Sequence, residues 1–331
     1  MALFGPDPEK VERWKQEGKV SKLRSTIEGG GPCAEQAQQA LVDIIADPSS
    51  MPLVTEDATL EAFQTLLNLD QHAASWAMLQ YAQTAGAHAA LACRMIDALA
   101  SRRTDAALLA TLRMAGSGLS GVGVHAVKAL IGMEHPRLNE ALRSAFLLAE
   151  REALVPLLGV LEVRQVPGAS KVLVHRFPKL PADLRKRVAR ALHRQGMGAA
   201  HAGDAVLRTY LLVEEERYAE AASQLELAWQ PLAEALGASP EPGDRTMRIL
   251  HALAHVDRNR LYHALRLRLA KAVGEAETHA DKETIAAARA AAAWILPALA
   301  DIYGRTGDVR EISMQLTADR FLAARSLLEA M

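Results

Sequence analysis

The feature that most constrains this chain is its surplus of alanine and leucine. Of its 331 residues, 63 are alanine and 47 are leucine, whereas valine, isoleucine, phenylalanine, tyrosine and tryptophan together number 43. Alanine and leucine are strong helix formers, and β-branched and aromatic residues favour strands. The composition therefore predicts an all-α fold. It argues against every function that needs a sheet, including a doubly wound nucleotide site.

Glycine and proline divide the chain at short intervals, and between these breaks apolar residues recur every three or four positions. In residues 33–46, for example, Ala37, Leu41 and Ile45 fall on one helical face. The predicted helices are short at first and lengthen after about residue 200. The longer ones are predicted at residues 203–215, 217–236, 244–256, 259–280, 281–303 and 309–330.

An Ala-Leu pair recurs on the apolar faces of the predicted helices, at residues 40–41, 98–99, 129–130 and 191–192. The successive separations of 58, 31 and 62 residues are close to multiples of about 30. Helix pairs that repeat at such a spacing are typical of α-solenoids, in which each pair buries its apolar face only against its neighbours. The spacing therefore predicts an α-solenoid of stacked helix pairs.

Residues 105–112 and 124–131 resemble the two helices of a HEAT repeat. Residues 154–161 resemble the proline-bearing first helix of that family, and residues 4–29 are similar to the N-terminal capping turn of bacterial HEAT-like proteins. The resemblance covers roughly residues 1–200. It implies a right-handed α-solenoid of antiparallel helix pairs, of the HEAT or armadillo kind, with an extended surface for binding another macromolecule.

The C-terminal third departs from this pattern. Residues 218–221 and 299–308 look more like tetratricopeptide helices. We therefore expect HEAT-like repeats over residues 1–200, followed by a helical region over residues 201–331 that is continuous with the solenoid. The repeat type of that second region is left open.

The formal net charge of −1 conceals a segregation of charges along the chain. Residues 25–93 contain no lysine or arginine but eight acidic residues. Residues 164–194 contain nine lysines and arginines against Asp183 alone, and residues 245–271 contain seven against Asp257 alone. This asymmetry is the strongest indication of a partner that the sequence offers.

A predicted helix over residues 182–195 carries the most concentrated basic face. We expect its apolar residues, Leu184, Val188, Ala191 and Leu192, to face inward. Arg187, Arg190 and Arg194 then share the opposite side. The candidate partner-binding residues are Arg185, Lys186, Arg187, Arg190 and Arg194.

Three interpretations of this basic strip are open. It is a solvated helix face, a surface for an acidic protein (a partner, or the acidic N-terminal part of another copy of this chain), or a nucleic-acid site. Polynucleotide binding usually needs a basic domain with aromatic or arginine platforms. The pI of about 6.8 and the aromatic content of 4% weigh against it.

His251 and His255 are four positions apart, which places both imidazoles on one helical face. Such a pair can bind a metal if a third ligand converges on it, and Asp257 and His263 are nearby in sequence. The glutamate of the H-E-x-x-H motif is missing, and so is the dipeptide His-Glu on which the HEAT-like di-iron hydroxylases depend. We favour surface or groove-lining histidines and predict neither a metal nor a cofactor.

Residues 116–121 match G-x-G-x-x-G, the phosphate-binding pattern of dinucleotide folds. In those folds the loop follows a strand, whereas here it follows a predicted helix, so we interpret it as an inter-helix turn. Cys33 and Cys93 are too few for a disulfide framework, and neither has the local motif of a nucleophile. We expect both cysteines to be reduced and buried.

The N-terminal residues lack the basic and apolar regions of a signal peptide. No uncharged apolar stretch reaches the length of about 18 residues that a membrane span needs. We therefore expect a cytoplasmic protein without a membrane partner.

Together these features favour a non-enzymatic scaffold or adaptor that binds another protein through a helical-repeat surface, with the basic strip favouring an acidic partner. One alternative is a nucleic-acid-binding or DNA-repair protein, by resemblance to the HEAT-like alkylpurine DNA glycosylases. Trp229 and Trp294 lie outside any basic run, so no residue is carried over from that family. A second alternative is an enzyme with a pocket between the helical parts. The oligomeric state is left open.

Overall fold

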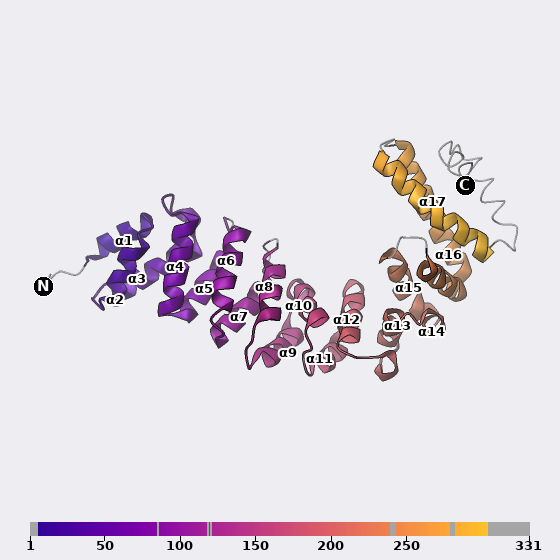
Figure 1. Cartoon of the computed structure of the whole chain (residues 1–331), viewed down its shortest axis with the longest axis horizontal. Coiled ribbons are helices and arrows are strands. Elements are labelled where there is room, and N and C mark those ends of the chain that lie inside the picture. The colour runs from indigo at the N-terminus through magenta and orange to yellow at the C-terminus, as the bar shows by residue number, and fades with distance from the viewer. Residues whose placement is uncertain are drawn as a thin grey trace. The chain divides into compact units, whose positions relative to one another are not determined.

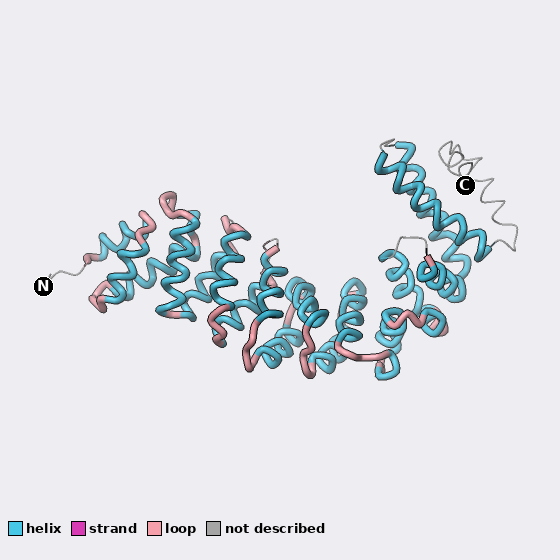
Figure 2. The backbone as a smooth tube through the Cα atoms, in the orientation of Figure 1, coloured by secondary structure: helices cyan, strands magenta, loops and turns pink. Residues whose placement is uncertain are grey.

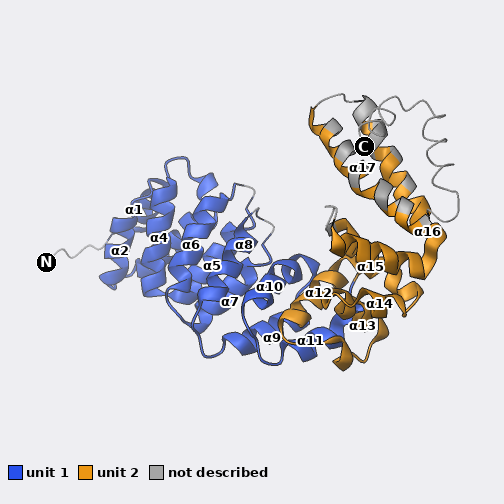
Figure 3. Ribbon diagram, turned by 45° about the vertical axis from the view of Figure 1, so that its right-hand side comes forward, with its two compact units in different colours: residues 1–180 blue, residues 181–331 orange. Residues whose placement is uncertain are grey.

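The computed structural model describes residues 6–84, 86–117, 119, 121–238, 243–278 and 282–303 (Figure 1). These residues form helices and loops and include no strand (Figure 2). The all-α fold that the composition predicts is therefore confirmed for the described part of the chain. The chain divides into two compact units, residues 1–180 and residues 181–331 (Figure 3), which are described in turn.

Unit 1 consists of short helices joined by tight turns. They are α1 (Pro8–Gln16), α2 (Val20–Glu28), α3 (Ala34–Ala46), α4 (Glu56–Leu69), α5 (Gln71–Tyr81), α6 (Ala89–Ala100), α7 (Asp105–Met114), α8 (Val122–Gly132), α9 (Leu138–Leu148), α10 (Arg151–Val163) and α11 (Ala169–Arg176), with single 3₁₀ turns at Pro48–Ser50 and Phe177–Lys179.

The helices of unit 1 form two series. The odd-numbered helices from α1 to α11 each contact the next odd-numbered helix, and the even-numbered helices from α2 to α10 each contact the next even-numbered one. In Figure 1, α4, α6 and α8 follow one another along one side, and α5, α7, α9 and α11 along the other. The starts of α4, α6 and α8, at residues 56, 89 and 122, are 33 residues apart. Over the whole unit, successive helix starts within a series are 26 to 37 residues apart, so the helices recur at a similar but not constant spacing.

Several of these helices begin at a capping residue. The Thr55 and Thr104 hydroxyls accept hydrogen bonds from the third amide that follows, at the starts of α4 and α7. The Asp70 carboxylate does the same at the start of α5. Such side chains satisfy amides that have no partner within the helix. The short polar breaks in the sequence are thus helix starts.

The core of unit 1 is a layer of apolar side chains contributed by helices of both series. Leu41, Phe63, Met78, Leu91 and Phe146 are fully buried there. Buried leucine and phenylalanine supply most of the hydrophobic free energy of such a layer.

Polar side chains also link each repeat to the next. The bonded pairs are Gln38–Asp70, Asp97–His125, Asp105–Arg137, Ile131–Arg164 and Ala149–Arg176, and their members are 27 to 33 residues apart in sequence. A contact one period away joins equivalent elements of neighbouring repeats. Hydrophobic packing and polar bonds therefore follow the same spacing.

Unit 2 contains α12 (Ala182–Arg194), α13 (Ala205–Glu214), α14 (Tyr218–Ala222), α15 (Glu226–Ala238), α16 (Asp244–Thr278) and α17 (Lys282–Tyr303), with a 3₁₀ turn at Ala199–His201. Helix α13 contacts α12, α14 and α15, and α16 contacts α14, α15 and α17. The predicted helix at residues 309–330 lies outside the described residues.

Helix α16 bends at Asp257, whose backbone is extended (φ −156°, ψ 99°). The Asp257 carboxylate accepts a hydrogen bond of 2.9 Å from the Arg260 amide and so caps the second half. The sequence predicts two helices here, at residues 244–256 and 259–280, and the bend confirms this division.

The single helix predicted at residues 217–236 is wrong. The structure has two helices, α14 and α15, separated at Leu225, which has a φ of +52°. A leucine in this left-handed region cannot continue a right-handed helix. Nothing in the apolar spacing signals this break, because the leucines on both sides keep a helical period.

The regular repeat also revises the interpretation of the Ala-Leu pairs. Residues 98–99 and 129–130 occupy α6 and α8, which are neighbours in one series. Residues 40–41 lie in α3, which belongs to the other series. All four leucines of the pairs are fully buried. The motif therefore marks buried helix faces in general and not one fixed position of the repeat.

Among the described helices, none has both the length and the hydropathy needed to cross a bilayer.

Candidate functional site

The basic helix predicted at residues 182–195 is α12, and its apolar face lies as predicted. Leu184, Val188, Ala191 and Leu192 are buried. Arg187, Arg190 and Arg194 are exposed on the other side, and Arg185 and Lys186 are half-buried at its edge. The structure therefore places all five candidate cations on one helix, but in different environments.

Lys186 and Arg190 are bonded within unit 2. The Lys186 ammonium donates a hydrogen bond of 2.7 Å to the backbone carbonyl of Glu234 in α15. Burial lowers the pKa of Lys186, and the nearby Glu234 carboxylate opposes this shift. The Arg190 guanidinium lies 3.4 Å from the Glu214 carboxylate in α13. These two cations connect α12 to the rest of its unit, whereas Arg187 has no salt bridge to any described residue.

Two further cations of the basic stretch at residues 164–194 belong to the repeat structure of unit 1. Arg164 donates to the carbonyls of Ile131 and Met133 at the end of α8. Arg176 donates to the carbonyls of Phe146 and Ala149 at the end of α9. The last carbonyls of a helix lack partners within it and favour a nearby positive charge. Part of the basic stretch is therefore explained by capping.

The acidic stretch at residues 25–93 is also partly used for internal bonds. Asp43 lies 3.4 Å from the Lys15 ammonium, and Asp57 lies 3.4 Å from the Arg94 guanidinium. Asp70 caps α5. The cationic partners lie just outside the stretch, one repeat away. Some acidic residues of this stretch are therefore paired with cations that lie outside it in the sequence.

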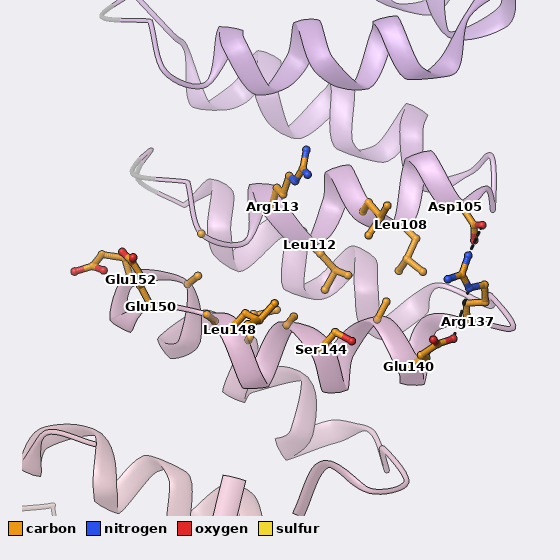
Figure 4. A pocket seen from close by; sticks show the side chains of 17 residues that line it. Asp105, Leu108, Leu112, Arg113, Arg137, Glu140, Ser144, Leu148, Glu150 and Glu152 are labelled. Atoms are coloured by element: carbon orange, nitrogen blue, oxygen red, sulfur yellow. Dashed lines mark hydrogen bonds and ion pairs between the residues drawn. The ribbon is translucent and has the colours of Figure 1, made fainter. Parts of the chain in front are cut away.

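A long apolar groove lies in unit 1 between α7 and α9 and continues to the start of α10 (Figure 4). Its volume is about 630 Å³. Its apolar lining consists of Leu108, Leu109, Leu112, Leu148 and Leu157 with Ala141, Ala145, Ala149 and Ala153. Leu109 and Leu148 are 53% and 77% exposed, respectively. The groove therefore presents large apolar side chains to solvent.

Charged side chains occupy the ends of this groove. At one end, the Arg137 guanidinium lies 2.8 Å from the Asp105 carboxylate and 3.6 Å from that of Glu140. At the other end, Glu150 and Glu152 are exposed and have no salt bridge to any residue that the structure describes. Arg113 of α7 lines the groove as well. The groove therefore has an apolar middle, one end where Arg137 is paired with carboxylates, and another end with two carboxylates that have no salt bridge to any described residue.

The α7–α8 turn fixes the width of the groove near α10. A β-carbon added to Gly116 would lie 2.8 Å from the Ala153 β-carbon, closer than real side chains approach. Gly121, at φ +79°, then begins α8. The G-x-G-x-x-G sequence thus follows a helix and precedes a helix, as the inter-helix interpretation predicts. Gly118 lies outside the described residues.

The sequence analysis missed the groove between α7 and α9. One signal was available, namely the adjacent leucines at residues 108–109 and 147–148. Two neighbouring leucines point about 100° apart on a helix, so one apolar face rarely holds both. Because nothing in one sequence tells which leucine meets a neighbouring helix, the pairs do not reveal a groove by themselves.

His251 and His255 line a second groove, of about 550 Å³, between α14 and α16. The His251 imidazole lies 2.9 Å from the Asp301 carboxylate in α17. Within the described residues, no three histidine, cysteine or acidic side chains converge as a metal site would require. Both imidazoles therefore line a groove on one side of α16.

The tryptophans considered for nucleic-acid recognition pack against arginines of unit 2. The Arg260 guanidinium lies 4.3 Å from the ring centre of Trp229. Trp294 is only 4% exposed and has Arg268 at 5.1 Å. Such cation–π contacts stabilise the helix packing. Trp294 therefore offers no open ring face on which a base could stack.

The two cysteines lie in different surroundings. Cys33 is buried, and its thiol donates to the Pro6 carbonyl. Cys93 is half-buried, and burial, helped by Asp97, raises the pKa of its thiol. A raised pKa leaves less of the reactive thiolate at neutral pH.

Comparison with known proteins gives no match: no family model fits the chain, and no curated protein or solved structure is significantly similar to it.

Proposed function

We propose that this chain is a non-enzymatic scaffold or adaptor that binds another protein through the surface of an α-solenoid. One observation supports the proposal above all: the helices of unit 1 form two series, each helix contacts the next of its own series, and successive starts within a series are 26 to 37 residues apart. Repeats that bury their apolar faces only against neighbours generate a long surface of equivalent grooves. Such a surface suits the binding of a macromolecule.

The proposed architecture is a right-handed solenoid of antiparallel helix pairs. The short turns between successive helices support antiparallel pairing. The HEAT or armadillo resemblance stays a prediction. The spacings of 26 to 37 residues are shorter than the period of about 40 to 47 residues that is usual for those repeats.

Within this function, we assign the exposed cations of α12 to an acidic partner. Arg187 is exposed on α12 and has no salt bridge to any described residue, while Lys186 and Arg190 are bonded within the unit. Exposed charges on the rim of an interface mainly accelerate association and select partners of opposite charge. We therefore expect Arg187 to contribute more to recognition than Lys186 and Arg190.

The experiment is affinity capture from the source cells with the full chain, followed by mass spectrometry. The variant is Arg187→Glu with Arg194→Glu, and the matched control is Lys271→Glu with Lys282→Glu, which reverses two exposed cations outside α12. Each lost exposed pair is worth about 0.2–1 kcal/mol, so the double reversal is expected to weaken capture about tenfold. Capture by the native chain should also fall with added salt.

Equal capture by the native chain, the α12 variant and the control would show that α12 is only a solvated face. Retention of nucleic acid in place of protein, abolished by nuclease treatment, would contradict the proposed function itself.

A further inference from the structure

We propose that the groove between α7 and α9 binds one amphipathic helix of a partner protein, with leucine-type side chains in the groove and a lysine or arginine against Glu150 and Glu152. The inference rests on the proposed function and specifies what the solenoid recognises. It concerns a surface of unit 1, which shares no residue with the basic strip of α12.

The apolar middle of the groove calls for an apolar occupant. Leu109 and Leu148 expose half or more of their surface, and Leu108, Leu112 and Leu157 lie beneath them. Covering these side chains removes apolar area from water, which is the main favourable term in association. Leu147, next to Leu148, is also 50% exposed but does not line the groove. Leu148 and Leu147 are therefore a matched pair of exposed leucines, of which only Leu148 lines the groove.

The lining of the groove favours a helix over an extended peptide. Apart from its charged side chains, the groove is lined by leucine and alanine side chains, Gly116 and the Ser144 hydroxyl. An extended peptide buried there would leave its amides and carbonyls without partners. A helix satisfies its own backbone and offers apolar side chains at positions i, i+3, i+4 and i+7. Helix α9 has 11 residues, so the groove accommodates about three turns, or roughly 17 Å.

The charges of the groove favour a basic occupant. Four carboxylates line it, from Asp105, Glu140, Glu150 and Glu152, against the two guanidinium groups of Arg113 and Arg137. Arg137 is engaged by Asp105 and Glu140, as Figure 4 shows. The carboxylates of Glu150 and Glu152 have no such partner among the described residues. A lysine or arginine near the end of the docked helix would meet them.

The test is a selection on the full chain with a display library of helical peptides of about 16 residues, roughly 24 Å long. The library varies the apolar stripe and the charges at both ends. We expect the selected peptides to share an apolar stripe of helical period and a lysine or arginine near one end. A selected peptide, synthesised with a fluorophore, is then titrated with the protein and followed by fluorescence anisotropy.

Matched variants of the protein separate the groove from its surroundings. Leu148→Asp is expected to weaken peptide binding at least tenfold, and Leu147→Asp, its control, less than twofold. Glu150→Gln with Glu152→Gln is expected to weaken binding several-fold at low salt, and Glu162→Gln, an exposed control in α10 outside the groove, to leave it unchanged. Both leucine variants change exposed residues, and circular dichroism verifies that they fold.

Several results would overturn the inference. They are selected peptides that are acidic or lack an apolar stripe, equal binding to Leu148→Asp and Leu147→Asp, and a selection that yields no binder while a long-chain fatty acid binds. These results leave the proposed function intact if the α12 variant still loses its partner in the capture experiment. If the peptide results are as expected but the native chain and the α12 variant capture the partner equally well, only the role of α12 is contradicted.

Discussion

The basic face of α12 and the groove between α7 and α9 differ in how much of their chemistry is used inside the chain. On α12, Lys186 and Arg190 are bonded to neighbouring helices of unit 2. In the groove, Leu148 and the carboxylates of Glu150 and Glu152 meet no partner in the described structure. A concentration of charge in the sequence thus partly serves the fold, whereas a groove left open after folding is available to a ligand.

The two surfaces also differ in what a partner would gain from them. Exposed arginines interact through water and are screened by salt, so each contributes little to affinity. Apolar side chains that leave water on binding contribute more, in proportion to the area covered. We therefore expect α12 to influence the rate and selectivity of association and the groove to supply affinity.

The largest effect that we expect concerns Arg176, a cation of the same basic stretch that caps α9. Arg176→Ala leaves the carbonyls of Phe146 and Ala149 without their charged donor. Hydrogen bonds to charged groups contribute about 1.5–3 kcal/mol each, so we expect a loss of about 2–3 kcal/mol in the free energy of unfolding. Urea unfolding measures it. Arg187→Ala, the matched control on α12, is expected to change it by less than about 0.5 kcal/mol.

Equal losses in these two variants would remove the distinction between structural and free cations. Such equal losses would also mean that the exposed face of α12 contributes to the free energy of unfolding.

The next effect concerns the floor of the groove. Gly116→Ala places a β-carbon 2.8 Å from that of Ala153, so the α7–α8 turn or α10 has to move. Overpacking of this kind costs about 1–3 kcal/mol. We expect a lower unfolding midpoint in urea and weaker binding of the selected peptide. Gly132→Ala, where an added β-carbon meets nothing within 4 Å, is the control. A variant with native stability and unchanged peptide affinity would show that the turn does not set the width of the groove.

The smallest effect is a pH dependence at Lys186. Burial holds its pKa in the folded state below the ordinary lysine value of 10.5. Between the folded and the unfolded pKa the unfolded chain binds more protons, so the free energy of unfolding rises with pH in that window. Below the window the unfavourable burial of the charge is fully present. We expect the native chain to gain stability relative to Lys186→Met as the pH increases towards 10.5.

Thermal unfolding of both proteins from pH 7 upwards measures this difference. A difference that stays constant or decreases with pH would show that Lys186 is solvated and belongs to the open basic face with Arg187.

Much of the fold was predictable from local patterns. The buried faces of α3 and α12, the division of α16 at Asp257 and the inter-helix turn at Gly116 all follow from residue type and spacing. The break at Leu225 was not predictable, because a leucine with positive φ has no signature in the sequence. That residues 40–41 fall in a different helix series from residues 98–99 and 129–130 was not predictable either, since an Ala-Leu pair suits any buried helix face.

The candidate site was predictable only in part. The helical period predicts which cations of α12 lie opposite its apolar face. Arg187, Arg190 and Arg194 are exposed, as this prediction requires. The bonds of Lys186 to α15 and of Arg176 to α9 join residues 48 and 27 to 30 positions apart. Contacts over such separations depend on how the helices stack, which one sequence does not specify.

The sequence by itself determined that the chain is helical, because alanine and leucine dominate it and because glycine, proline and capping residues mark the helix ends. These are local effects that operate within one or two turns. Only the tertiary structure decided which charges are neutralised by the neighbouring repeat and which leucines stay exposed. Both depend on the register between helices about 33 residues apart. The charges that are segregated in the sequence are therefore partly paired between helices that lie far apart in the chain, and the groove between α7 and α9 stays open.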